Sequence, residues 1–197
     1  MQNEVPKLYG LVLAGGKSTR MGTDKGLLNY HGKPQQEFLY ELLDEVCDQA
    51  FLSIRKDQNQ SILNDFKVVV DNNEYRGPFN GILSAHKMHP EVAWLVLACD
   101  LPLLELQSIK TLVKSRNARQ LATSFATNQS GLPEPLITIW EPKGLQKAIK
   151  HLSSAESTCP RKFLINSDIK LVTPERDELL YNANSLEDYQ FAKSKIQ

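Results

Sequence analysis

A glycine-rich loop directly after a short apolar run is the feature that most constrains the fold of this chain. The run covers residues 8–13 and is typical of a buried strand. The loop that follows carries the adjacent glycines Gly15 and Gly16 and the basic residues Arg20 and Lys25. Glycines let backbone N–H groups converge on oxyanions without a clash from Cβ, and basic side chains add positive charge. The strand and loop therefore predict a pocket for a polyphosphate.

Two common phosphate-binding motifs do not fit this loop. The dinucleotide-binding fingerprint needs the pattern G-x-G-x-x-G, whereas Gly15 and Gly16 are adjacent and no glycine follows until Gly22. The P-loop needs a glycine five residues before its Gly-Lys-Ser/Thr, and Leu11 stands at that position. The loop therefore belongs to a third kind of phosphate site.

Apolar periodicity predicts alternating strands and helices along the whole chain. Predicted strands cover residues 8–13, 50–54, 66–70, 94–99, 121–126 and 135–140. Predicted helices cover residues 34–49, 81–89, 108–116 and 143–152, and a last one starts near Ser185. We therefore expect a single Rossmann-like α/β domain over residues 1–197, with a mainly parallel sheet and helices on both faces. Ligands of such sheets bind beyond the carboxyl ends of the strands.

Composition excludes several classes of protein. The 197 residues carry 23 basic and 23 acidic side chains, so no overall field favours nucleic acid or an anionic membrane. The three cysteines, Cys47, Cys99 and Cys159, are widely spaced, which indicates reduced thiols. The longest apolar run, residues 92–99, is too short for a membrane span, and the N-terminus lacks a signal-peptide layout. We expect a soluble cytoplasmic protein that binds neither nucleic acid nor membrane.

Two acidic residues follow predicted strands at the edge where the loop lies. Asp100 ends the apolar run 94–99, a position that suits an oxygen ligand of Mg²⁺ but also a turn or a helix N-cap. Asp71 follows the apolar run 68–70, where it would contact the nucleoside, help to place the metal or cap a loop. Because a phosphate loop lies at the same edge, we favour the metal site for Asp100.

The motifs of the chain together resemble a known family. The loop matches the nucleotidyltransferase pattern L-x-G-G-x-x-x-R-x-G-x-x-K of the glycosyltransferase-A-like fold, at Leu13, Gly15, Gly16, Arg20, Gly22 and Lys25. Further motifs follow at Asp71, Gly77-Pro78 with Gly81, Asp100 with Pro102, Pro133-Glu134-Pro135-Leu136, and Asn182 with Asn184. In this order and spacing the chain resembles the molybdenum cofactor guanylyltransferases over nearly its whole length.

This resemblance implies that the chain transfers GMP from GTP to the terminal phosphate of molybdopterin, with or without bound molybdenum, and releases pyrophosphate. It implies a nucleotide-binding N-terminal half and an acceptor-binding C-terminal half. The implied GTP-binding residues are Leu13, Ala14, Gly15, Gly16, Lys25, Asp71 and Asp100. Among these, Lys25 would contact the phosphates, Asp71 the guanosine, and Asp100 both GTP and Mg²⁺. The implied acceptor-binding residues are Asn182 and Asn184. The candidate catalytic residues are Arg20, Lys25 and Asp100, because Arg20 and Lys25 would stabilise charge on the pyrophosphate and Asp100 would hold Mg²⁺.

One position departs from the family pattern. The family often has Asn just after the second strand to hold the guanine nucleotide, and Ser53 stands there in this chain. A serine offers one hydroxyl, whereas an amide offers two donors and an acceptor. The alternatives that stay open are a cytidylyltransferase of the same pathway, a sugar-phosphate nucleotidyltransferase, and a non-catalytic adaptor that binds a nucleotide or the cofactor.

Two further expectations concern the acceptor and its destination. Residues 159–162 are interpreted as a loop before a helix, where Arg161 and Lys162 would meet an anionic pterin phosphate. Candidate protein partners are molybdoenzyme chaperones or cofactor-inserting proteins. The chemistry needs no protein nucleophile, because the acceptor phosphate already carries ionised oxygens.

Overall fold

The computed structural model describes residues 4–15, 24–58, 66–154 and 157–196. In this part of the chain the strands are β1 (Leu8–Leu13), β2 (Gln49–Ile54), β3 (Val68–Val70), β4 (Ala93–Ala98), β5 (Ala122–Ala126), β6 (Pro133–Trp140) and β7 (Lys170–Val172). The α-helices are α1 (Gln35–Asp44), α2 (Pro78–Met88), α3 (Leu106–Lys114), α4 (Pro142–Leu152), α5 (Pro160–Ile165) and α6 (Leu186–Ile196). Short 3-10 helices are η1 (Lys25–Leu27), η2 (Lys56–Gln58) and η3 (Asp177–Leu180).

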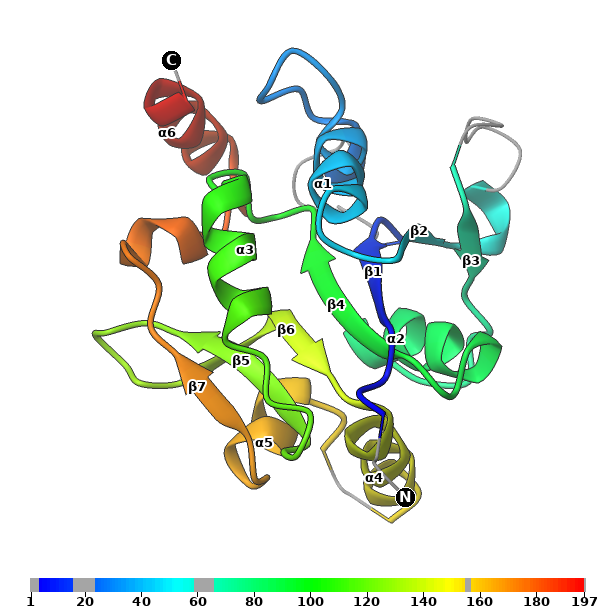
Figure 1. Ribbon diagram of the computed structural model, residues 1–197. Coiled ribbons are helices and arrows are strands. Elements are labelled where there is room, and N and C mark those ends of the chain that lie inside the picture. Colours follow the sequence, from blue (N-terminus) through cyan, green and yellow to red (C-terminus); the bar gives the residue numbers. More distant parts are fainter. Residues whose placement is uncertain (1–3, 16–23, 59–65, 155–156, 197) are drawn as a thin grey trace.

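The described strands form one sheet in the order β3-β2-β1-β4-β6-β5-β7 (Figure 1). Every pair is parallel except the two that β6 makes, with β4 and with β5. The predicted α/β domain with a mainly parallel sheet is therefore confirmed. The chain moves from β1 outward to β2 and β3 and then returns to place β4 on the other side of β1. This change of direction leaves a crevice at the carboxyl ends of β1 and β4, which is the usual place for a ligand.

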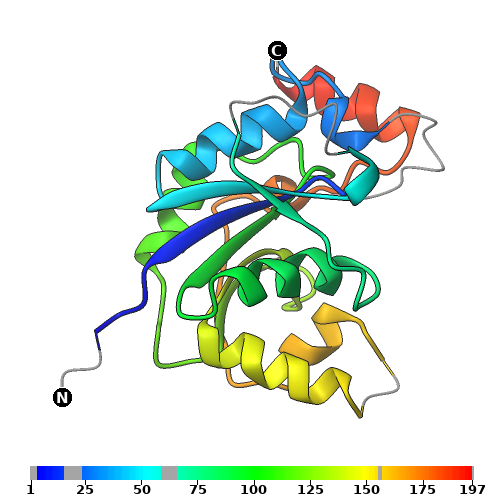
Figure 2. The same cartoon turned by 90° about the vertical axis from the view of Figure 1, so that its right-hand side faces the viewer.

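Strand residues alternate between two hydrophobic cores, one on each face of the sheet. In β1, Leu8 and Val12 pack into the core beneath α1 and α3, while Tyr9 and Leu11 pack into the core beneath α2, α4 and α5. Figure 2 shows α1 on one side of the sheet and α2 and α4 on the other. Because both faces are covered, the central strands are apolar throughout instead of alternating with polar residues.

Two helices begin earlier than the sequence predicts. Residues 160–162, expected in a loop, form the first turn of α5, because proline is well suited to the first position of a helix. Helix α2 begins at Pro78, also at a first helical position, and not at residue 81. None of the described helices is long and apolar enough to cross a membrane.

A buried ion pair joins the end of α3 to the start of α4. Arg116 donates from Nε and Nη2 to Oε1 and Oε2 of Glu141 at 2.7 and 2.9 Å. The Glu141 side chain is 1% exposed, so breaking the pair would leave a buried charge without its partner. The Arg116→Met substitution should therefore lower the free energy of unfolding by about 3–5 kcal/mol, measured by denaturant titration.

A matched control for this variant is Arg176→Met. Arg176 pairs with Glu105 at 2.5 Å, but both side chains are more than half exposed. An exposed pair contributes about 1 kcal/mol or less, so this control should unfold almost like the wild type. Equal losses in the two variants would contradict the importance of burial at Arg116.

Candidate functional site

A pocket of about 560 Å³ opens at the carboxyl ends of β1, β2, β3 and β4. The register aligns these ends, because Leu13 pairs with both Ser53 and Ala98 while Ile54 pairs with Val70. The pocket is lined by Leu13, Ala14, Gly15, Asp24, Lys25, Gly26, Ser53, Arg55, Asp71, Asn73, Tyr75, Gly77, Pro78, Asn80, Gly81, Ala98, Cys99, Asp100, Leu136 and Asn184. Its volume falls in the range of small-molecule and cofactor sites, about 300–1,000 Å³.

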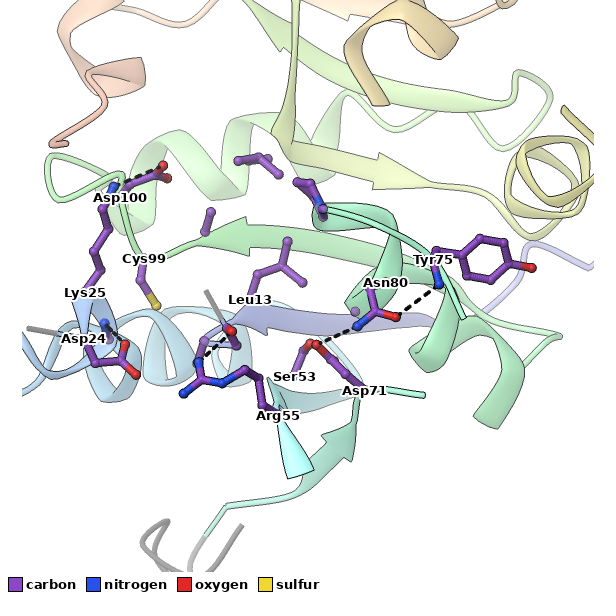
Figure 3. A pocket seen from close by; sticks show the side chains of 18 of the residues that line it. Leu13, Asp24, Lys25, Ser53, Arg55, Asp71, Tyr75, Asn80, Cys99 and Asp100 are labelled. Carbon is purple, nitrogen blue, oxygen red and sulfur yellow. Dashed lines mark hydrogen bonds and ion pairs between the residues drawn. The ribbon is translucent and has the colours of Figure 1, made fainter. Parts of the chain in front are cut away.

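Asp100 lies at one end of this pocket, just beyond β4 (Figure 3). Its Oδ1 atom is buried and has no hydrogen-bond partner among the described residues, and its Oδ2 atom lies 3.8 Å from the Lys25 ammonium. Burial raises the pKa of the Asp100 carboxyl, and the charge of Lys25 lowers it in part. A buried carboxylate oxygen left without a partner is costly, so it is expected to meet a cation or a donor from a ligand.

Lys25 is held in position by its own 3-10 helix, η1, and by the segment that precedes α6. It begins η1, whose N-cap is Asp24, and the Asp24 carboxylate accepts from the backbone N–H of Gly26. Its ammonium donates to Oδ1 of Asn184 at 2.6 Å, and the backbone N–H of Ala183 donates to the carbonyl of Asp100 at 2.8 Å. The segment before α6 therefore lies alongside Asp100, and it brings Asn184 into the predicted nucleotide pocket.

Gly15 brings the loop backbone against the carboxylate of Asp71. A Cβ at Gly15 would lie 3.0 Å from Asp71 Oδ2, and the Gly15 carbonyl accepts from the Arg55 guanidinium at 2.7 Å. A side chain at this position would crowd the Asp71 carboxylate, so glycine lets the loop backbone lie close to it. The predicted loop residues Gly16 and Arg20 lie outside the described residues.

The other end of the pocket holds a hydrogen-bonded cluster around Asp71 (Figure 3). Asp71 Oδ1 accepts from the Ser53 hydroxyl at 2.7 Å, and Oδ2 accepts from the Asn80 amide at 3.3 Å. Burial raises the pKa of Asp71, whereas these two donors and the charge of Arg55 lower it. Ser53 is itself covered, since a Cβ at Gly81 would lie 2.3 Å from its hydroxyl oxygen. Ser53 is therefore a buried residue of the pocket wall that orients Asp71.

A second hollow, of about 720 Å³, adjoins the first through shared lining residues Gly77, Pro78 and Leu136. Asn182 lies in this hollow, together with an ion pair in which the Arg161 guanidinium donates to Oε2 of the buried Glu134 at 2.6 Å. Because β6 runs opposite to β4, its first residues reach the same edge at which the parallel strands end. The reversal of β6 therefore explains why the Pro133–Leu136 motif contributes to this edge.

The structure thus brings most predicted site residues to one edge of the sheet. Leu13, Ala14, Gly15, Lys25, Asp71, Asp100 and Asn184 line the first pocket, and Asn182 lines the second hollow. The predictions missed Asn80 and Arg55 in the pocket and Glu134 as the partner of Arg161. Within the described ranges no three His, Cys, Asp or Glu side chains form a metal cluster. Magnesium sites usually take one or two carboxylates and complete their shell with water and phosphate oxygens, so a single Asp100 carboxylate fits that pattern.

Comparison with known proteins gives consistent matches. A family model, the MobA-like NTP transferase domain, matches residues 10–170. The molybdenum cofactor guanylyltransferase of Pseudomonas aeruginosa is 31% identical over 166 residues, which make up 82% of this chain and 81% of that protein. The molybdenum cofactor biosynthesis bifunctional protein of Synechocystis sp. is 40% identical over 183 residues, covering 92% of this chain and 52% of that protein. This chain therefore spans about half the length of the Synechocystis protein.

A solved structure supports the fold. The crystal structure of molybdopterin-guanine dinucleotide biosynthesis protein A from Archaeoglobus fulgidus superposes with a TM-score of 0.76. The match covers 95% of this chain and 97% of that one, at 18% sequence identity. At this identity the likeness establishes a shared arrangement of strands and helices.

Proposed function

Because this chain belongs to the MobA-like NTP transferase family, and within it to the molybdenum cofactor guanylyltransferases, we propose that it transfers GMP from GTP to the terminal phosphate of molybdopterin. The products are pyrophosphate and a guanine dinucleotide form of the cofactor. The observation that carries this proposal is the pocket itself, which places a glycine loop, a lysine and a buried carboxylate at the switch point between β1 and β4.

In this proposal the nucleotide lies along the edge of the sheet. The triphosphate faces Lys25 and Asp100, the backbone at Leu13, Ala14 and Gly15 supports its middle, and the guanosine points toward Asp71. Lys25 offers a charge-assisted hydrogen bond to the phosphates from the pocket wall. Contacts of Gly16 and Arg20 with the nucleotide stay predictions, since both lie outside the described residues.

Asp100 is the residue that would hold Mg²⁺, together with phosphate oxygens of the nucleotide. The buried Oδ1 atom, which has no hydrogen-bond partner among the described residues, supports this assignment. When bound, the ion would act as a Lewis acid on the phosphates. Lys25 lies beside Asp100 and would share in neutralising the phosphate charge.

The chemical step needs positioning more than a protein nucleophile. An oxygen of the acceptor phosphate attacks the α-phosphorus of GTP, and the bond between this phosphorus and the bridging β-oxygen breaks, so that pyrophosphate leaves with the bonding electrons. The residues of the pocket align the two phosphates and stabilise the charge that builds on the leaving group. We propose that Lys25 and Arg20 serve this last purpose.

The second hollow is proposed as the site of the pterin acceptor. It adjoins the nucleotide pocket, contains Asn182 and Arg161, and is built largely from the C-terminal half of the chain. Asn184, the other predicted acceptor-binding residue, lines the nucleotide pocket and accepts a hydrogen bond from Lys25. This arrangement supports a division into a nucleotide-binding N-terminal half and an acceptor-binding C-terminal half.

The cellular compartment and the partner proteins are also part of the proposal. Cys47, Cys99 and Cys159 form no disulfide, which favours a reducing cytoplasm. Molybdoenzyme chaperones or cofactor-inserting proteins are the partners proposed to receive the product.

Direct synthesis tests the proposed reaction. The purified chain is incubated with GTP, Mg²⁺ and molybdopterin, and the product is weighed by mass spectrometry. A mass equal to molybdopterin plus a guanylyl group, with one pyrophosphate released per product, is the expected result. Binding of GTP and molybdopterin without any product would instead indicate a non-catalytic adaptor.

The nucleotide preference is a separate prediction. GTP should outcompete CTP, ATP and UTP, because Ser53 positions Asp71 and does not itself have to read the base. Competition titrations with a fluorescent GTP analogue would measure the preference. Equal or tighter binding of CTP would overturn the guanine assignment and favour a cytidylyltransferase.

A further inference from the structure

The polar groups of the pocket are separated along the edge of the sheet. Asp100 follows β4 and Asp71 follows β3, and the strand order β3-β2-β1-β4 places three strand spacings between them. At about 4.8 Å a spacing this separation is roughly 14 Å. Figure 3 shows Lys25 with Asp100 at one end and Asp71 with Asn80 at the other. If the phosphates of a nucleotide lie at the first end, its base lies at the second.

The second end carries a fixed pattern of acceptors and donors. The backbone N–H of Tyr75 donates to Asn80 Oδ1 at 3.4 Å, and because this N–H can only donate, it turns the Asn80 NH₂ group toward Asp71. Within the described part of the chain, the second N–H of that group contacts the exposed amide oxygen of Asn73, at a long 3.4 Å. Among the described residues each Asp71 oxygen accepts one hydrogen bond, and it keeps a further lone pair. The pattern is therefore two acceptors beside one available donor.

We propose that Asn80 is the specificity-determining residue of this pocket, and that its amide donates to O6 of guanine while Asp71 accepts from N1–H and N2–H. This inference rests on the proposed function and names the part of the site that selects the base. Guanine presents two adjacent donors beside an acceptor, which complements the pattern of Asp71 and Asn80. Cytosine presents acceptors at O2 and N3, which would face the Asp71 carboxylate without a proton. Adenine offers a single donor beside an acceptor and no O6.

The surroundings of Asn80 support a role in binding. Asn80 lies on the first turn of α2, which begins at Pro78 after Gly77, a residue with φ of 63°. Its backbone N–H donates to the carbonyl of Gly77, so its side chain is not needed to cap the helix. Ser53 already holds Asp71 through Oδ1 at 2.7 Å, shorter than the 3.3 Å contact from Asn80. The Asn80 amide can therefore turn from its weak contacts to a base without releasing Asp71.

The test compares nucleotides that differ at single positions of the base. In 6-thio-GTP a sulfur, a weak acceptor, replaces O6, and ITP lacks only the N2 amino group. Calorimetric titration gives the dissociation constants of GTP, 6-thio-GTP and ITP for the wild type and for Asn80→Ala. We expect Asn80→Ala to weaken GTP binding about threefold to tenfold and to bind GTP and 6-thio-GTP equally. The ratio of GTP to ITP affinity should stay that of the wild type, because N2 is read by Asp71.

A second variant and a control keep the result interpretable. Asn80→Asp keeps the size of the side chain but replaces the donor with an acceptor, so it should weaken GTP binding more than Asn80→Ala does. Asn72→Ala changes a neighbouring exposed asparagine outside the pocket lining and should leave all three constants unchanged. Thermal unfolding of each variant confirms that the protein has folded.

The outcomes separate this inference from the proposed function. If Asn80→Ala keeps the wild-type ratio of GTP to 6-thio-GTP affinity, or weakens all nucleotides equally, Asn80 is a structural residue and the inference is wrong while the function stands. If the wild type does not prefer GTP to CTP, both the proposed guanylyl transfer and the role of Asn80 are wrong. That result comes from the wild-type titrations and needs no variant.

Discussion

Replacing Asp100 with Asn should reduce Mg²⁺-dependent turnover by on the order of 10³-fold while leaving the fold intact, because metal catalysis contributes several kcal/mol to the transition state. The amide keeps the shape of the side chain but removes the charge that would hold the ion. Because burial raises the pKa of Asp100, the carboxylate is disfavoured in the free protein, and the neutral amide should melt at the same temperature or higher. GTP binding measured without metal should change little.

The control for Asp100→Asn is Asp24→Asn. Asp24 also lines the pocket, but its Oδ1 accepts from the backbone N–H of Gly26 and its Oδ2 from the Gln58 amide. A Mg²⁺ titration at fixed GTP should therefore give an unchanged apparent Mg²⁺ affinity for Asp24→Asn and a much weaker one for Asp100→Asn. Normal melting with near-normal Mg²⁺-dependent turnover in Asp100→Asn would reduce Asp100 to a turn residue.

The central part of the fold could be predicted because each strand is buried on both faces and is therefore apolar from end to end. The predicted strand at residues 8–13 coincides with β1, and the one at 94–99 is shifted by one residue from β4. The direction of β6 could not be predicted, since an apolar run reads the same in either direction. Strand β7 was missed because it has three residues at the edge of the sheet, and its Leu171 is 47% exposed.

Some positions in the candidate site could be predicted from the sequence, and others could not. Asp100 and Asp71 could be predicted, because each directly follows an apolar strand and the carboxyl ends of parallel strands meet at one edge. The resemblance to a family added Asn182 and Asn184. The position of Asn184 could not be predicted from local pattern, because its hydrogen bond with Lys25 spans 159 residues of sequence. Asn80 was missed because residues 77–81 are typical of a turn, whereas the helix starts at Pro78 and aims the amide at Asp71.

Replacing Lys25 with Ala should weaken GTP binding at least tenfold. A hydrogen bond between an ammonium and a phosphate contributes about 1.5–3 kcal/mol, and each 1.4 kcal/mol is about a factor of ten in affinity. The loss has a second source, since the Asp100 carboxylate lies 3.8 Å from the ammonium and would face the phosphates with one fewer cation beside it. The expected losses can be measured as dissociation constants for GTP and as kcat/KM for turnover.

The Lys25→Ala variant should still fold, so that its loss of GTP binding can be distinguished from unfolding. The Lys25 side chain is 21% exposed, and its contacts with Asp100 and Asn184 are polar, so its removal costs little apolar burial. Lys33→Ala is the matched control, because Lys33 also pairs with a carboxylate, that of Glu41 at 2.7 Å, but lies outside the pocket lining. If Lys25→Ala and Lys33→Ala both bind GTP like the wild type, Lys25 does not contact the nucleotide. If only Lys25→Ala binds GTP weakly and it melts normally, the triphosphate lies beside Lys25 and Asp100. The guanine base would then lie at the other end of the pocket, where Asp71 and Asn80 are proposed to recognise it.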